Sequence, residues 1–152
     1  MADTLRPRLD RLQELSKTLN SSIDEAGKIV QGVESFLSDI IHLGITGGVL
    51  IDSEDLPEIG YYSSTSLIYG RYGPKFRIFV TVSVDDQGRE DRPKETLWAN
   101  CSRDLKLQTF NKLPALLDKL IENLESTLAQ VTDNTELIQA FLPPAKEKGA
   151  KS

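Results

Sequence analysis

The sequence has too few metal-binding and redox side chains for several classes of site. Of its 152 residues, one is a cysteine, Cys101, and one is a histidine, His42. A single cysteine excludes an intramolecular disulfide, and a structural zinc site needs a set of Cys and His ligands that this chain does not have. We therefore expect no disulfide, no metal centre and no cofactor. We interpret Cys101 as a small buried apolar side chain and His42 as a residue at a helix C-terminus.

Long apolar runs and an excess of basic charge are also missing. No run approaches the roughly 20 apolar residues that a membrane-spanning helix needs, and charged residues occur within the first turns of the N-terminal segment, which argues against a secretory signal. The formal net charge is −5, which on average repels nucleic-acid phosphates and anionic lipids. The sequence thus predicts a soluble, cytoplasmic protein that binds no membrane, and it argues against nucleic acid as a partner.

Catalytic and nucleotide-binding motifs are not found either. The glycines of "GITGG" and "YGRYGP" are not followed by the lysine and hydroxyl residue of a phosphate-binding loop. Two acidic loops, at 52–58 and 85–91, do not match the ligand spacing of a calcium-binding EF-hand. No nucleophile elbow is present. We therefore predict no catalytic and no metal-binding residues, which favours a non-enzymatic protein.

Helical periodicity is abundant in the first part of the chain. Apolar residues from Leu9 to Ile40 recur at steps of three and four, and Ser16 is the one polar break. This heptad pattern predicts a long amphipathic helix over 4–42, either continuous or interrupted near 20–22.

The same period returns in the last third of the chain. Ser102 is placed to cap a helix N-terminus, and Pro114 fits in the first turn of a following helix. We expect helices over 103–142, the last a separate short one at 135–141, and a disordered tail over 143–152, which contains small and charged residues.

Between these helical segments the apolar period changes to two. This pattern predicts four strands within 48–100, connected as an antiparallel meander: 48–52, 61–72, 76–84 and 95–101. The element order predicts a single α+β domain over 1–142 in two layers, with both long helices packed on one face of the sheet and antiparallel to each other.

The hairpin around Gly73 and Pro74 allows its register to be predicted. A two-residue loop pairs Tyr72 with Lys75, whereas a three-residue loop would place Arg71 directly opposite Arg77. Like charges directly opposite each other are unfavourable, so we prefer the two-residue loop. The core face then carries these side chains: Leu67, Tyr69, Phe76, Ile78, Val80, Val82 and Val84.

The second face of this hairpin is the candidate binding surface. It combines apolar and aromatic side chains with a basic rim, as protein interfaces do: Ile68, Tyr72, Lys75, Arg77, Phe79 and Trp98. The alternative is that the chain's own helices cover this face, since large apolar patches rarely stay exposed.

These observations lead to one functional hypothesis and two alternatives. The first is a non-enzymatic interaction, adaptor or regulatory protein that binds another protein through this face and forms a homodimer through a heptad stripe. The second is a nucleic-acid-associated regulator that uses Arg71, Lys75 and Arg77. The third is a small ligand-binding or enzymatic domain with a pocket near Cys101 and Tyr69.

Overall fold

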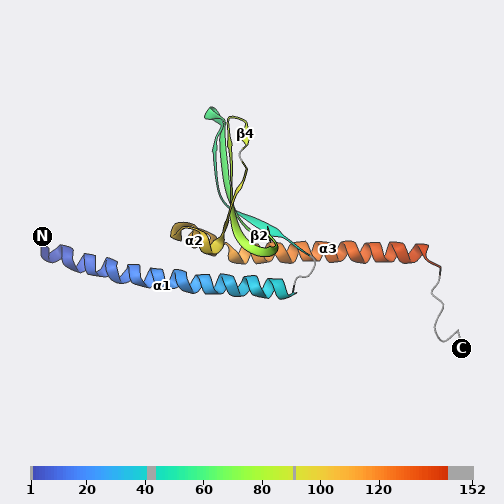
Figure 1. Cartoon of the computed structure of the whole chain (residues 1–152), viewed down its shortest axis with the longest axis horizontal. Helices are drawn as coiled ribbons and strands as arrows, with labels where there is room; N and C mark the ends of the chain where they lie inside the picture. The colour runs from blue at the N-terminus through green and yellow to red at the C-terminus, as the bar shows by residue number, and fades with distance from the viewer. Residues whose placement is uncertain (1, 41–43, 91, 144–152) are drawn as a thin grey trace.

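The protein has an α+β fold, which confirms the predicted fold class. The computed structural model describes residues 2–40, 44–90 and 92–143, with side chains from residue 5 onward. A long helix, α1 (Ala2–Ile40), precedes an antiparallel sheet, and two helices, α2 (Arg103–Phe110) and α3 (Leu113–Phe141), follow it (Figure 1). His42 and nearly all of the predicted tail lie outside the described residues.

Helix α1 is continuous, so the interruption considered near 20–22 is not present. Its stripe of apolar side chains is used in two different ways. Ile23, Val30 and Leu37, spaced seven residues apart, are buried in the core. All side chains from residue 5 to residue 22 are exposed, although the same stripe continues through them.

The two C-terminal helices confirm Ser102 as an N-cap and Pro114 in a first turn, but not the predicted break. The hydroxyl of Ser102 accepts a hydrogen bond from the Leu105 amide, and Pro114 lies in the first turn of α3. The separate short helix predicted over 135–141 is wrong, because α3 runs through it without interruption. Thr135 donates its hydroxyl to the Val131 carbonyl at 2.7 Å within the same helix, and exposed polar residues there cost only tenths of a kcal/mol, about the spread of ordinary helix propensities.

The sheet is the predicted meander, extended and slightly rearranged. β1 (Gly47–Leu56), β2 (Tyr61–Tyr72) and β3 (Lys75–Asp86) are sequential neighbours. The last predicted strand, 95–101, is the shorter β5 (Lys94–Leu97), and an additional strand, β4 (Arg89–Glu90), lies in the segment predicted as an acidic loop; both pair with β3.

The register of the central hairpin is the predicted one. Tyr72 lies opposite Lys75 across a two-residue loop, and Tyr69 lies opposite Ile78. Gly73 has a φ of 63°, a backbone conformation that glycine adopts without steric cost.

The core lies where the base of the sheet meets the helices. Leu67, Tyr69, Ile78 and Val80 of the predicted core face pack there with buried side chains of α1 and α3. α1 contacts β3, whereas α3 contacts β1 and β2. The layers are therefore those predicted.

The prediction that the long helices run antiparallel is wrong. α1 and α3 run in the same direction (Figure 1). The reason is that the chain leaves the sheet beside the middle of α1: Arg103 donates a hydrogen bond to Asn20, and Phe110 lines a surface hollow with Ala26 and Ile29. α2 thus runs along α1, and α3 continues in that direction.

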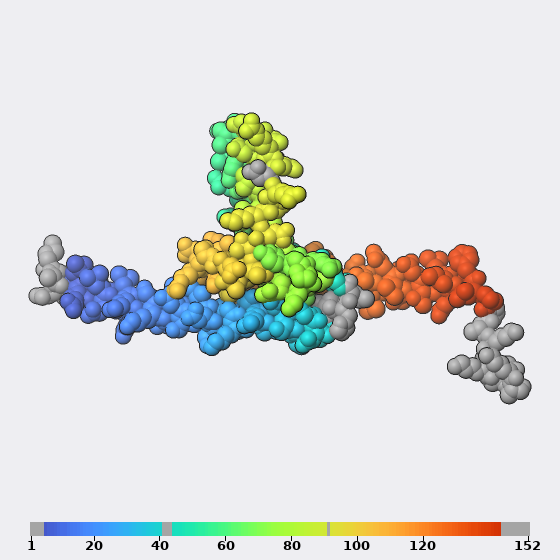
Figure 2. Space-filling model, in the orientation of Figure 1, coloured from blue at the N-terminus to red at the C-terminus, as the bar shows by residue number. Residues whose placement is uncertain are grey.

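Three parts of the chain extend away from this core (Figures 1 and 2). We call residues 5–22 the α1 arm and residues 125–142 the α3 arm; they extend from opposite ends of the body. The half of the sheet that carries β4 stands away from the helices as a ribbon with no buried residue. No helix among the described residues is long and apolar enough to cross a membrane.

Candidate protein interaction surface

An apolar groove lies between α1 and α3. Its volume is about 500 Å³. Phe36, Ile40 and Ile121 are each more than half exposed on it. The lining contains glycine and apolar residues only: Ile29, Gly32, Val33, Phe36, Leu37, Ile40, Leu117, Leu120, Ile121 and Leu124. We call this the α1–α3 groove.

The groove continues along both arms as heptad-spaced stripes. On α1, the groove residues Ile29, Val33 and Phe36 belong to a stripe whose exposed members in the α1 arm are Leu5, Leu12, Leu15 and Leu19. On α3, Leu117, Ile121 and Leu124 are followed at steps of four and three by Leu128, Val131, Ile138 and Leu142. These are the spacings that bury side chains against another helix. Nothing in the described part of the chain covers them.

The exposed area of the chain is large for its mass. The accessible surface is 11621 Å², whereas a compact monomer of 16.9 kDa is expected to expose roughly 7,700 Å². The difference exceeds the roughly 800 Å² that each partner buries in a standard protein interface. The shape and the apolar stripes therefore both indicate a surface that is completed by another molecule.

The predicted sheet face is assembled in part. Ile68 lies directly opposite Phe79, and the rings of Tyr72 and Phe79 are 5.4 Å apart. Phe79 is buried, however, because Ile68 and Leu97 flank it on the two adjacent strands. Phe79 therefore has little exposed surface with which to contact another molecule.

The placement of Trp98 on this face is wrong. β5 ends at Leu97, which takes the position opposite Phe79, and a 3-10 turn over Trp98–Asn100 then directs the indole into the core. Its Nε1 donates to the Thr109 hydroxyl at 2.8 Å. Trp98 thus stabilises the fold.

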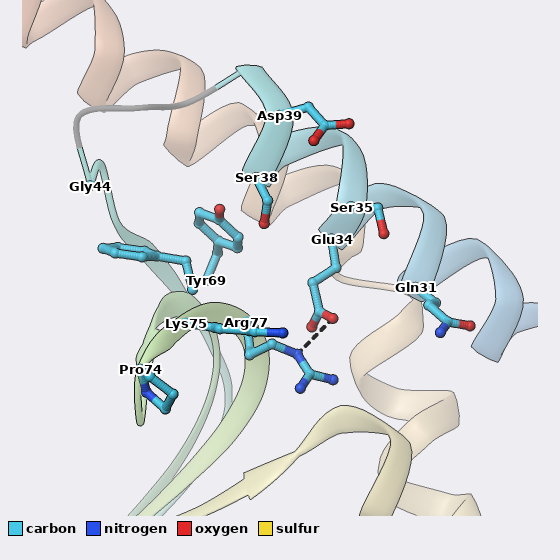
Figure 3. A pocket seen from close by; sticks show the side chains of 11 residues that line it. Gln31, Glu34, Ser35, Ser38, Asp39, Gly44, Tyr69, Pro74, Lys75 and Arg77 are labelled. Atoms are coloured by element: carbon cyan, nitrogen blue, oxygen red, sulfur yellow. Dashed lines mark hydrogen bonds and ion pairs between the residues drawn. The ribbon is translucent and has the colours of Figure 1, made fainter.

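The basic residues of the hairpin lie beside a polar cavity. Arg77 Nε donates to Glu34 Oε1 at 2.8 Å, and the Ile78 amide donates to Oε2 at 2.7 Å (Figure 3). Glu34 thereby completes the hydrogen bonding of β3 just beyond the end of β5. Sequence reasoning missed Glu34, and no local pattern distinguishes it from other helix-surface carboxylates.

This cavity, of about 630 Å³, carries charges of both signs. Glu34 and Asp39 come from α1, with Ser35 and Ser38 between them along the helix, and Lys75 and Arg77 come from the hairpin (Figure 3). With its acidic and basic groups balanced and Arg77 held by Glu34, the cavity shows no preference for a ligand of one charge.

Cys101 and Tyr69 do not line a common pocket. Tyr69 reaches the polar cavity, whereas the Cys101 thiol donates to the Leu97 carbonyl at 3.4 Å on another side of the core. Burial raises the pKa of the Cys101 thiol, and the nearby Lys106 ammonium opposes that rise. The thiol is therefore less ionised than usual and poorly suited to act as a nucleophile.

The two acidic loops lie together at the far tip of the ribbon. Asp85 pairs with Tyr62 and Glu90, and Tyr62 pairs with Asp55. The described residues contain no group of three Asp, Glu, His or Cys side chains that could hold a metal ion. The sheet is thus acidic at its tip and basic at the hairpin turn.

Comparison with known proteins assigns no family. No protein-family model, no curated protein and no solved structure matches this chain. The surface of the chain itself is therefore the basis for a functional assignment.

Proposed function

We propose that this chain is a non-enzymatic interaction protein that assembles with a partner through the α1–α3 groove and the stripes on its two arms. The observation that carries the proposal is the groove, which is lined by apolar side chains and continues into unpartnered heptads on both sides. Such stripes bind helices, whose own apolar faces supply the matching side chains. The partner surface is therefore helical.

The energetic argument rests on apolar side chains that remain exposed to solvent in the folded chain. Fully burying one leucine or phenylalanine contributes about 1.5–3 kcal/mol relative to leaving it exposed. Phe36, Ile121 and Leu128 each keep more than half of their surface in contact with solvent. A helix laid along the groove would remove these surfaces from water together.

The groove is a better candidate than the sheet face or the basic hairpin. Phe79 and Trp98, two residues of the predicted sheet face, are buried within the fold. Arg77 is ion-paired with Glu34 at 2.8 Å, which does not favour the alternative of a nucleic-acid site. Ile68, Tyr72 and Lys75 retain exposed area and can extend the interface, but they do not form its centre.

Cysteine labelling tests whether the groove is covered in the cell. Phe36→Cys places a reporter thiol in the groove, and Lys28→Cys places one on an exposed position of the same helix as a matched control. In a native lysate containing the chain at its cellular concentration, we expect a maleimide to label position 36 more slowly than position 28. Equal labelling rates at the two positions, in the lysate and in the concentrated pure chain, would contradict the proposal.

A further inference from the structure

We infer that the partner helices belong to a second copy of this chain, so that the α1 arm of each copy pairs antiparallel with the α3 arm of the other. This inference rests on the proposed function and names its partner. The arms extend in opposite directions from one body, and α1 and α3 run in the same direction (Figures 1 and 2). A two-fold axis across the middle of the groove therefore brings each α1 arm alongside the partner's α3 arm, and both contacts form at once.

The two arms are similar in length. Helix α1 begins at Ala2 and α3 ends at Phe141, so the helix up to residue 22 is about 32 Å long and the helix from residue 125 is about 26 Å long, at a rise of 1.5 Å per residue. An antiparallel pair that aligns Leu5 with the partner's Leu142 leaves about one turn of α1 overhanging. Both arms would then be covered by the same association.

The apolar positions match in register at both ends of the paired arms. When the ends are aligned, Leu5 lies beside the partner's Leu142, Leu9 beside the partner's Ile138, and Leu19 beside the partner's Leu128. Apolar side chains therefore meet at these three positions, as heptad packing requires. The mixed pairs lie in the middle of the arms, where Leu12, Leu15 and Ser16 fall beside the partner's Thr135, Thr132 and Val131.

The charges of the arms are complementary. The α3 arm has three acidic side chains, Glu125, Asp133 and Glu136, and no basic ones. The α1 arm has a net charge of +2, from four basic and two acidic side chains: Arg6, Arg8, Arg11, Lys17, Asp10 and Glu14. Pairing like arms would bring +2 against +2 and −3 against −3, whereas pairing unlike arms is attractive. The charge pattern therefore selects the antiparallel, two-fold arrangement.

Disulfide trapping tests the arrangement in the full chain. The double variant Leu19→Cys/Leu128→Cys should form a covalent dimer under mild oxidation by diamide, with a mass twice 16.9 kDa. Both substituted leucines are exposed in the single copy, so the variants should fold. The single variants Leu19→Cys and Leu128→Cys should remain uncrosslinked, because neither position meets its own copy.

The possible outcomes separate this inference from the proposed function. If either single variant crosslinks as well as the double variant, like arms pair and the inference is overturned. If light scattering finds a monomer at all concentrations while position 36 is protected in the lysate, self-pairing is wrong but another helical partner remains. If position 36 is labelled as fast as position 28 in the lysate and in the concentrated pure chain, both proposals fail.

Charge reversal gives an independent measurement of the same pairing. Arg11→Glu with Lys17→Glu should raise the dimer dissociation constant about tenfold in low salt, because Arg11 lies beside the partner's Glu136, Lys17 lies about one turn from the partner's Asp133, and the change occurs twice per dimer. Adding Asp133→Lys and Glu136→Lys should restore association. Arg89→Glu with Lys94→Glu, the same charge change placed on the ribbon, should have no effect. An equal effect of the ribbon variant would contradict pairing of the arms.

Discussion

The carboxylate of Glu34 is expected to contribute measurably to the stability of the fold. It joins α1 to β3 by accepting from Arg77 Nε at 2.8 Å and from the Ile78 amide at 2.7 Å. Ile78 is buried, and its amide lies just beyond the last residue of β5 that pairs with β3. Replacing Glu34 by alanine removes both acceptors at once.

The magnitude follows from these two contacts. An unpaired buried amide costs about 1–3 kcal/mol. The ion pair adds less, about 1 kcal/mol or below, because the Arg77 side chain is one-third exposed and solvent screens the charges. We therefore expect Glu34→Ala to lower the free energy of unfolding by about 1–4 kcal/mol. Glu34→Gln, which keeps an oxygen acceptor for the Ile78 amide, should cost about 1 kcal/mol.

Urea unfolding followed by tryptophan fluorescence measures these differences. Trp98 is the one tryptophan of the chain and lies buried near α1, so its emission should report loss of this packing. All variants are compared at one protein concentration, because association would add to the apparent stability. Glu25→Ala, which removes the exposed ion pair with Lys28, is the matched control and should cost below about 0.5 kcal/mol. The reasoning would be refuted if Glu34→Gln were as destabilising as Glu34→Ala, or if Glu34→Ala were no worse than the control.

Three further predictions concern the core. Thr109→Val should cost about 1–3 kcal/mol, because it leaves the Trp98 indole N–H without its acceptor; Thr109→Ser should restore most of this in the same urea assay. Gly27→Ala should stabilise the chain by up to about 1 kcal/mol, since alanine favours the helix and its Cβ would lie 3.7 Å from the Trp98 ring, an ordinary contact; a loss of stability would show that the contact is too tight. Cys101 should react with a disulfide reagent at pH 8 far more slowly in the folded chain than in urea, because burial raises its pKa; equal rates would show that the thiol is accessible.

The central hairpin shows what sequence alone could establish. The two-residue loop at Gly73 and Pro74 and the cost of opposing Arg71 with Arg77 were sufficient to predict every pair from Tyr72 with Lys75 to Leu67 with Val80. These are local constraints, since loop length and strand alternation determine them. The helix ends at Ser102 and Pro114 were predictable for the same reason.

Trp98 shows where such reasoning stops. Its placement depended on whether the strand continued beyond Leu97, and a single-residue difference in strand phase moves a side chain to the other face. The 3-10 turn that redirects the indole is stabilised by tertiary contacts, with Thr109 and Phe110 on α2. No pattern within 95–101 contains that information.

The relative direction of the two long helices could not be predicted from the sequence for a similar reason. A heptad stripe has the same spacing in parallel and antiparallel pairs, so it predicts that α1 and α3 bury their faces but not how they are oriented. The orientation is determined by where β5 ends along α1. The groove was not predicted either, because it requires two stripes to meet side by side.

The ribbon has a consequence for how the fold opens. β2 and β3 are each continuous from the buried base, at Tyr69 and Ile78, to the exposed tip beside β4. Backbone amides with few buried neighbours exchange with solvent through local openings, whereas those in the core exchange only when the whole fold opens. Each of these strands therefore contains amides that exchange by local opening and amides that exchange only by global opening. Deuterium uptake should rise steadily from Leu67 toward Tyr61. A load applied at the tip would therefore reach the core through the continuous strands β2 and β3.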